Sequence, residues 1–283
     1  MQTVLLLSII LGMLLQSVAK KAFNKCSGDK GAYLFTAISV LAAAAFFAII
    51  GKKPFRFDAA WLPYSLGFAL SYGVASIGSF LAIQYGSLSL TSLATSYSLI
   101  IPTLYGLMFL GEPGSSYLYI GIVLLLVSLL LINTKKGDMK ISLKWAIFAF
   151  LGFLGNGVCS TVQKVQQTVF DGAAKNEFMI VALLVVAVIL FLMSFGSEKE
   201  SWKPCVKKGI GWMLLCGIAN GAVNLFVMVL SASMPASVMF PLISAGGILA
   251  TALVAKLIFQ EKLTVKQYVG MLLGIGAVIF LNL

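Results

Sequence analysis

The chain has 283 residues, of which 60% are hydrophobic and 10% charged, and its mean hydropathy is +1.02. A soluble protein of this length needs far more charge on its surface, so the composition excludes an ordinary soluble enzyme or binding domain. The formal net charge is +11, but the lysines lie at the ends of apolar segments, where they are typical of topology signals and headgroup anchors. We therefore expect contact with the lipid bilayer and not with nucleic acid.

Apolar segments of roughly 20 residues recur along the whole chain, which is typical of a polytopic α-helical protein of the cell membrane. The first of them carries Ser17-Val18-Ala19, which resembles a signal-peptidase site. No lysine or arginine precedes this apolar run, so we interpret it as a retained helix. The first five predicted helices cover residues 3–22, 31–50, 61–85, 91–110 and 115–133.

A lysine-bearing linker, residues 135–144, separates these helices from five more. Pro102 and Pro241 fall in the fourth and ninth helices, and each lacks the backbone N–H that a helix would use. We therefore expect a kink at each proline, which frees a backbone carbonyl toward a cavity or a neighbouring helix. The later predicted helices cover residues 145–168, 177–195, 209–230, 236–259 and 265–283.

The end of the chain repeats an earlier stretch, because residues 261–282 align without a gap on residues 112–133. Any two membrane helices share aliphatic residues, but that resemblance does not explain matched polar positions, so we favour duplication of a membrane unit. The identities that carry this argument are Glu112 on Glu261, Tyr119 on Tyr268, Gly121 on Gly270 and Asn133 on Asn282.

The first and sixth helices match as well, because aligning Lys21 with Lys164 also brings together the serines four residues before them. We therefore predict two repeats of five helices, residues 1–134 and residues 145–283. Since five is odd, the second repeat enters the membrane from the opposite side. The predicted fold is all-α, with ten transmembrane helices arranged as two inverted five-helix repeats.

The junctions between helices resemble a known family. Leu110-Gly111-Glu112 and Phe259-Gln260-Glu261 each follow an apolar helix and precede a short polar turn and a glycine-containing apolar helix. This pattern resembles the EamA-type repeat of the drug/metabolite transporter superfamily, and residues 234–243 are similar to the ninth helix of such proteins. The resemblance implies ten helices in two bundles around a central cavity, lined mainly by helices 1, 3, 4, 6, 8 and 9.

The resemblance also implies export or exchange of small solutes, since family members carry amino acids, nucleotide derivatives, sugars, phosphorylated metabolites and drugs. The sequence departs from the small multidrug exporters of the superfamily, which carry a glutamate in the middle of helix 1. Helix 1 here has only Gln16 and Ser17 in its second half and no mid-helix carboxylate. Proton coupling is therefore no more strongly indicated than exchange or facilitated diffusion.

Four charged residues near helix ends are candidates for function. Glu112 and Glu261 stand at a turn before the next helix, where a carboxylate meets free backbone N–H groups and the positive end of the helix dipole. We interpret both as helix caps rather than transport sites. Lys21 and Lys164 either anchor their helix ends at the membrane interface or lie beside the cavity and bind an anionic or zwitterionic solute.

Neutral polar residues inside the apolar helices are better candidates for a solute site. Asn220 and Asn224 are four residues apart and share one helix face, although hydrogen bonding between helices is an alternative role for them. Gly217 and Gly221, on the same helix, are expected to serve helix packing. We expect the solute to bind near mid-membrane, and the predicted substrate-binding residues are Tyr72, Ser96, Asn220, Asn224, Phe240, Pro241, Lys21 and Lys164.

The sequence predicts a secondary transporter that moves a small polar or amphipathic metabolite by alternating access. A non-transporting membrane subunit, such as the partner of a lipid-linked sugar flippase, is the alternative. An enzyme is not expected, because histidine is absent, the nine acidic residues are scattered over turns, and the four cysteines lack metal-site or disulfide spacing. We expect no cofactor and no metal, and a monomer or homodimer whose partners are the solute and the bilayer.

Membrane orientation is the point on which two indications conflict. Most of the 20 basic residues lie in the turns after helices 1, 5, 7 and 9, so the positive-inside rule places both termini outside. The family resemblance implies that both termini are inside. Our prediction follows the charge distribution and places both termini outside.

Overall fold

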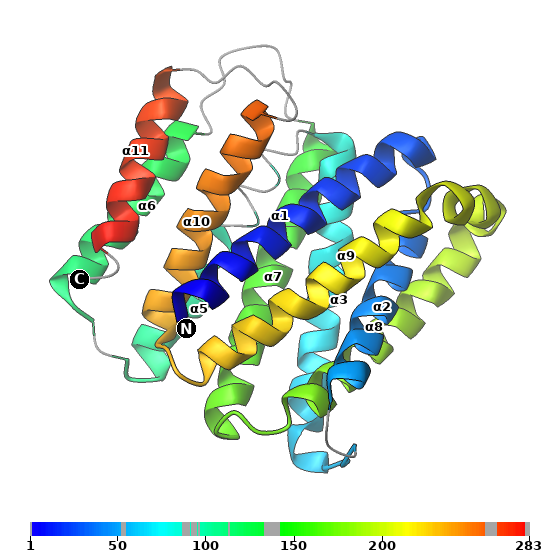
Figure 1. Cartoon of the computed structure of the whole chain (residues 1–283), viewed down its shortest axis with the longest axis horizontal. Helices are drawn as coiled ribbons and strands as arrows, with labels where there is room; N and C mark the ends of the chain where they lie inside the picture. Colours follow the sequence, from blue (N-terminus) through cyan, green and yellow to red (C-terminus); the bar gives the residue numbers. More distant parts are fainter. Residues whose placement is uncertain are drawn as a thin grey trace.

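The computed structural model describes residues 2–51, 55–86, 91, 95, 97–112, 114–132, 142–257 and 265–280. Within these residues the chain forms ten α-helices and two short 3-10 helices, and no β-strand (Figure 1). The helices of the first half are α1 (Gln2–Ser27), α2 (Ala32–Ile50), η1 (Ala59–Trp61), α3 (Leu62–Tyr85), α5 (Ile100–Phe109) and α6 (Ser116–Ile132). Those of the second half are α7 (Leu143–Val169), α8 (Lys175–Ser197), η2 (Lys199–Ser201), α9 (Trp202–Ser231), α10 (Ala236–Leu257) and α11 (Val265–Phe280).

Six of these helices are long and apolar enough to cross a membrane, namely α1, α2, α3 with η1, α7, α8, and α9 with η2. The remaining helices α5, α6, α10 and α11 are apolar but shorter in the described part of the chain. Large apolar side chains cover the outward faces, and Ile49 and Leu192, for example, are 83% and 69% exposed. Such faces suit lipid and not water. The prediction of an all-α, multi-pass membrane protein is confirmed.

The predicted fourth helix is broken one turn before its proline. Ser98 and Leu99 form a turn, and α5 begins at Ile100, two residues before Pro102. The Asn156 side chain of α7 donates a hydrogen bond to the Thr95 carbonyl at 3.3 Å, so a neighbouring helix meets a carbonyl at this break. The break lies near Pro102, but the carbonyl that Asn156 meets is not the one that Pro102 would free. That carbonyl belongs to Ser98 and accepts a hydrogen bond from the Ile101 N–H group at 3.0 Å.

A carboxylate from the second half stabilises the start of α2. Glu198, which follows α8, accepts hydrogen bonds from the backbone N–H groups of Tyr33 and Leu34 at 3.2 and 3.0 Å. The first N–H groups of a helix have no partner inside the helix, and a carboxylate there also meets the positive end of the helix dipole. This contact holds the start of α2 against the α8–α9 junction.

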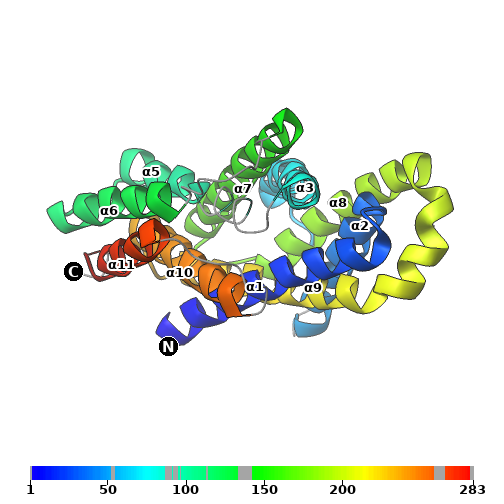
Figure 2. The same ribbon diagram turned by 90° about the horizontal axis from the view of Figure 1, so that it is seen from above.

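The helices pair across the two halves of the chain. Helix α1 packs along α9, and α3 packs along α7. Three further pairs join α2 with α8, α5 with α10, and α6 with α11. Figure 2 shows α3 and α7 on one side of the molecule and α1 and α9 on the other, with α6 and α11 at one end. Each pair contains one helix from before the linker and one from after it, so the core lies between the halves.

Glycines set the distance between several of these pairs. A methyl group at Gly155 of α7 would lie 2.6 Å from the Ala75 nitrogen of α3, and one at Gly78 of α3 would lie 2.7 Å from the Gly152 nitrogen of α7. Only glycine allows backbones to approach this closely. On α9, a methyl at Gly221 would lie 2.6 Å from the Phe46 ring of α2. Together with Gly217, which also meets α2, this confirms the predicted packing role of the glycine pair on that helix.

Candidate functional site

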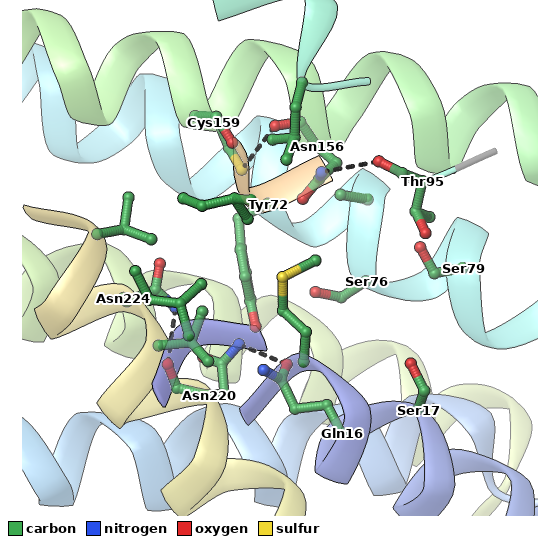
Figure 3. A pocket seen from close by; sticks show the side chains of 18 of the residues that line it. Gln16, Ser17, Tyr72, Ser76, Ser79, Thr95, Asn156, Cys159, Asn220 and Asn224 are labelled. Carbon is green, nitrogen blue, oxygen red and sulfur yellow. Dashed lines mark hydrogen bonds between the residues drawn. The ribbon is translucent and has the colours of Figure 1, made fainter. Parts of the chain in front are cut away.

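A cavity of about 160 Å³ lies where the two halves meet (Figure 3). Its lining comes from α1, α3, α7, α9 and α10, together with described residues of the segment before α5. Five of the six helices that the family resemblance implied therefore line the cavity, and the predicted fourth helix contributes through Thr91, Thr95 and Leu99, which precede α5. The volume is below the roughly 300–1,000 Å³ typical of sites for drug-sized ligands, so the space suits a small solute.

Polar side chains from two facing helices reach the middle of the cavity. On α3 they are Tyr72, Ser76 and Ser79, which share one face because they stand at helical spacing. On α9 they are Asn220 and Asn224, one turn apart. Figure 3 shows the Tyr72 ring extending from α3 toward Asn220. Three of the predicted site residues therefore meet in one place.

Four amide side chains form a continuous hydrogen-bonded chain along one wall. The Gln163 amide of α7 donates to the Asn224 side-chain oxygen at 3.4 Å, and the Asn224 amide donates to the Asn220 side-chain oxygen at 3.1 Å. The Asn220 amide in turn donates to the Gln16 side-chain oxygen of α1 at 3.0 Å. We call Gln163, Asn224, Asn220 and Gln16 the amide chain. It ties α7 and α9 to α1.

Two backbone carbonyls fix the direction of the amide chain. Gln163 also donates to the Asn224 carbonyl at 3.2 Å, and Asn224 also donates to the Asn220 carbonyl at 3.0 Å. A carbonyl only accepts, so the nitrogen end of each of these amides must face it. The orientation then passes along the chain to Gln16, whose oxygen accepts from Asn220 and whose nitrogen has no hydrogen bond within the described residues.

Lys20 brings a positive charge to the lining, from the last part of α1. It is half-buried and stands one turn after Gln16 on the same helix face. No aspartate or glutamate is among the described residues that line the cavity. The described lining therefore carries a lysine at one end and otherwise amides, hydroxyl groups, a thiol and apolar side chains.

Glu112 and Lys164 form a junction outside the cavity lining. The Glu112 carboxylate accepts hydrogen bonds from the backbone N–H groups of Ala236 and Ser237 at 2.7 and 2.8 Å, at the start of α10. The predicted capping role is therefore observed, but the capped helix is α10 in the other half and not α6, which follows Glu112 in the chain. Sequence proximity pointed to the wrong helix because the α5–α6 turn packs against α10. Glu261 lies outside the described residues.

Lys164 completes this junction. Its ammonium lies 3.5 Å from a Glu112 carboxylate oxygen and donates to the carbonyls of Ser231 and Met234, both at 2.9 Å. Those carbonyls lie at the end of α9, where a cation offsets the negative end of the helix dipole. The lysine thus links the end of α9 with the start of α10, and its ammonium group is engaged by these partners. We call Glu112, Lys164 and these backbone groups the ionic junction.

The structure brings together some of the predicted site residues and not others. Tyr72, Asn220, Asn224 and Phe240 line the cavity. Pro241 is buried inside α10, and it, Lys21 and Lys164 are not among the lining residues. For Lys164 the physical reason is its full set of partners in the ionic junction. Ser96 lies outside the described residues.

Sequence reasoning missed Gln16 and Lys20 as lining residues. On α1 the lining stripe runs through Met13, Gln16 and Lys20, and Lys21 is one residue, or about 100°, further around the helix. The signal that was available is the spacing of Gln16 and Lys20, two polar residues one turn apart on the same face of α1. The packing of α1 on α9 decides which of the two adjacent lysines faces inward.

Comparisons with known proteins bear on this geometry. A family profile described as the EamA-like transporter family matches residues 140–283. None of the curated proteins matches the chain. Among solved structures, a chain described as "Crystal structure of protein" is similar over 99% of this chain and 98% of its own length, with 14% sequence identity and a TM-score of 0.74. At that identity the similarity shows the shared fold alone.

Proposed function

This chain belongs to the EamA-like transporter family, and from that premise we propose that it moves a small polar solute across the membrane by alternating access through the cavity between its halves. Family membership implies membrane transport, and the family is not one of enzymes. The proposal adds the path, which is the cavity lined by Tyr72, Asn220, Asn224 and Phe240. We further propose the cell membrane as its location and a monomer or homodimer as its working form.

The observation that carries the proposal is that equivalent positions of the two halves line the cavity. The alignment that matches Lys21 with Lys164 pairs four lining residues of α1 with four of α7. A separate alignment without gaps, which places Tyr72 on Asn220, pairs four lining residues of α3 with four of α9. A cavity built from matched positions can open to either side of the membrane by equivalent motions. The pairs are Met13 with Asn156, Gln16 with Cys159, Ser17 with Ser160, Lys20 with Gln163, Tyr72 with Asn220, Ala75 with Val223, Ser76 with Asn224, and Ser79 with Val227.

The helix pairing supports the same proposal. If α1, α2, α3, α5 and α6 correspond in order to α7, α8, α9, α10 and α11, exchanging the halves turns the α1–α9 pair into the α7–α3 pair. The pairs α2–α8, α5–α10 and α6–α11 map onto themselves. This is the pattern that two five-helix repeats would give around a twofold axis. We infer repeats at residues 1–134 and 145–283, inverted because each has an odd number of helices.

The lining suits a carrier. Amide and hydroxyl groups give oriented hydrogen bonds, and a solute held by a few such bonds can be released on either side. A transporter needs this balance, because a site that binds too tightly would not empty.

Flux measurement after reconstitution tests the proposal. Purified protein in liposomes is expected to exchange small polar solutes, and replacing both Asn220 and Asn224 by leucine is expected to abolish this flux with folded yield nearly unchanged. Leu214→Ala with Ile218→Ala, on the exposed face of the same helix, is the matched control and should keep wild-type flux. Full transport by the double asparagine variant would show that the solute does not pass through the proposed cavity. Absence of flux in the wild type, restored when a partner protein is added, would favour a subunit role.

A reporter that works only in the cytoplasm tests the orientation. The distribution of basic residues predicts that both termini lie outside, so a fusion after Leu283 should be inactive. An active fusion would place the termini inside, as the family resemblance implies.

A further inference from the structure

Among the described residues, the cavity holds a lysine without a carboxylate partner. Lys20 lines the cavity and, within the described part of the chain, makes neither a hydrogen bond nor an ion pair with a carboxylate. The Cys216 thiol interacts with it electrostatically. A charge that is withdrawn from water and left unpaired is unfavourable, so charged groups in such positions are usually paired or serve a function. None of the described lining residues is acidic, so the lysine meets no carboxylate among them.

A second donor stands beside it. Gln16 is one turn before Lys20 on α1, and its side-chain oxygen already accepts from Asn220. Its NH₂ group has no hydrogen bond within the described residues and lies at the end of the amide chain. Because backbone carbonyls fix the direction of that chain, the NH₂ group cannot be exchanged for the oxygen without breaking the bond from Asn220. The hydroxyl of Ser17, which also lines the cavity, can add a third donor.

From these residues we propose that the cavity binds the anionic end of its solute at Gln16 and Lys20, so that the transported solute carries a carboxylate or phosphate group. The inference rests on the proposed function, since it takes the cavity as the solute path. An ammonium and an amide NH₂ supply hydrogen bonds to one anionic group, and charge-assisted bonds are stronger than neutral ones. A cationic solute finds no acidic partner in the described lining.

The two halves differ at this point, which gives the bound solute a direction. The position that corresponds to Lys20 in the second half is Gln163, and its amide is already bonded to Asn224. At this matched position of the lining, α1 therefore carries a lysine and α7 a neutral amide. The anionic end of the solute is held on the α1 side, and its remainder faces Tyr72 and Asn156, which line the opposite wall.

Solute pairs that differ in charge test this assignment. The probes are lactate against lactamide, pyruvate against pyruvamide, and glycerol 3-phosphate against glycerol, with choline as the cation. Each is measured for thermal stabilisation of the purified protein and for flux into liposomes. At least one anion is expected to stabilise and to be transported at least tenfold better than its neutral partner. Lys20→Met is expected to abolish that preference, and Lys20→Arg to retain part of it.

Lys25→Met is the matched control, because it removes the same charge from an exposed position on the same helix and should keep the preference. Folded yield from size-exclusion chromatography shows that each variant is intact. An anion preference that survives Lys20→Met, or no preference for any anion in either measurement, overturns the assignment. If neutral or cationic probes are transported and Lys20→Met does not change their flux, the transport function is supported and the anion site is ruled out. If an anion stabilises the protein only when Lys20 is present but is not transported, the anion site is supported and the transport function is ruled out.

Discussion

Lys20 and Lys164 are both withdrawn from water near the interface between the halves, but their surroundings are opposite. Lys164 has a carboxylate and two carbonyls within 3.5 Å and is only 6% exposed. Lys20 faces the cavity and has no hydrogen bond or ion pair within the described residues. Burial alone therefore does not distinguish a structural lysine from one that binds a solute. The set of partners does: it assigns Lys164 to holding the fold, and it supports the proposal that Lys20 meets a ligand.

The largest expected effect is on the ionic junction. Lys164→Met would leave the Glu112 carboxylate buried without its counter-charge and two carbonyls without a donor. Removing one partner of a buried ion pair typically costs about 3–5 kcal/mol, so we expect a large fall in thermal stability and folded yield. Fluorescence-monitored unfolding of the detergent-solubilised protein measures this loss.

A double variant separates the ion pair from simple loss of side-chain volume. Glu112→Gln with Lys164→Met removes both charges, and it should be less destabilised than the sum of the two single variants. Additive losses would show that the two residues act independently, and the assignment of Lys164 to this junction would then be wrong.

An intermediate effect is expected in the amide chain. Gln163→Glu replaces two donated hydrogen bonds by a carboxylate facing two oxygens of Asn224, so the first link is lost. An unsatisfied buried group costs about 1–3 kcal/mol, and we expect a moderate fall in unfolding temperature. The exposed Ser8→Ala, also on a helix, serves as a control and should change little. An unfolding temperature equal to that of the wild type would show that the amide chain does not contribute to stability.

The smallest effect on stability is expected at Lys20. Lys20→Met removes an unpaired charge and breaks no hydrogen bond of the described structure, so the ligand-free protein should unfold at the same temperature or slightly higher. The flux of an anionic solute should fall although thermal stability does not. A structural lysine would show the opposite, a loss of stability. A loss of stability as large as that of Lys164→Met would mean that Lys20 has a structural partner.

The pattern of the sequence was sufficient to predict the helices and the elements of the cavity. The matched glutamates, serines and lysines indicated two related halves, and the spacing of Asn220 and Asn224 correctly placed both on the cavity face of α9. Hydropathy and spacing carry this information because lipid imposes long apolar helices, and because residues one turn apart share a face.

The partners of individual charges could not be predicted in the same way. Neighbouring lysines at positions 20 and 21 differ by about 100° around the helix, and only the packing of α1 on α9 decides which one faces the cavity. Likewise, Glu112 precedes α6 in the chain but caps α10, because the turn that carries it meets a helix from the other half. Contacts between residues far apart in sequence produce no local sequence pattern, so they cannot be predicted from residue spacing.

The most direct test of the account is whether the cavity opens to both sides of the membrane. Ser76 lines the cavity, and Ser76→Cys in a background without Cys26, Cys159, Cys205 and Cys216 gives a single thiol there. Membrane-impermeant thiol reagents are added to one side of sealed vesicles at a time. Alternating access predicts that the thiol is labelled from each side of the membrane. A transported solute should slow the labelling rate from both sides. Labelling from one side only, in the presence and absence of solutes, would contradict the account.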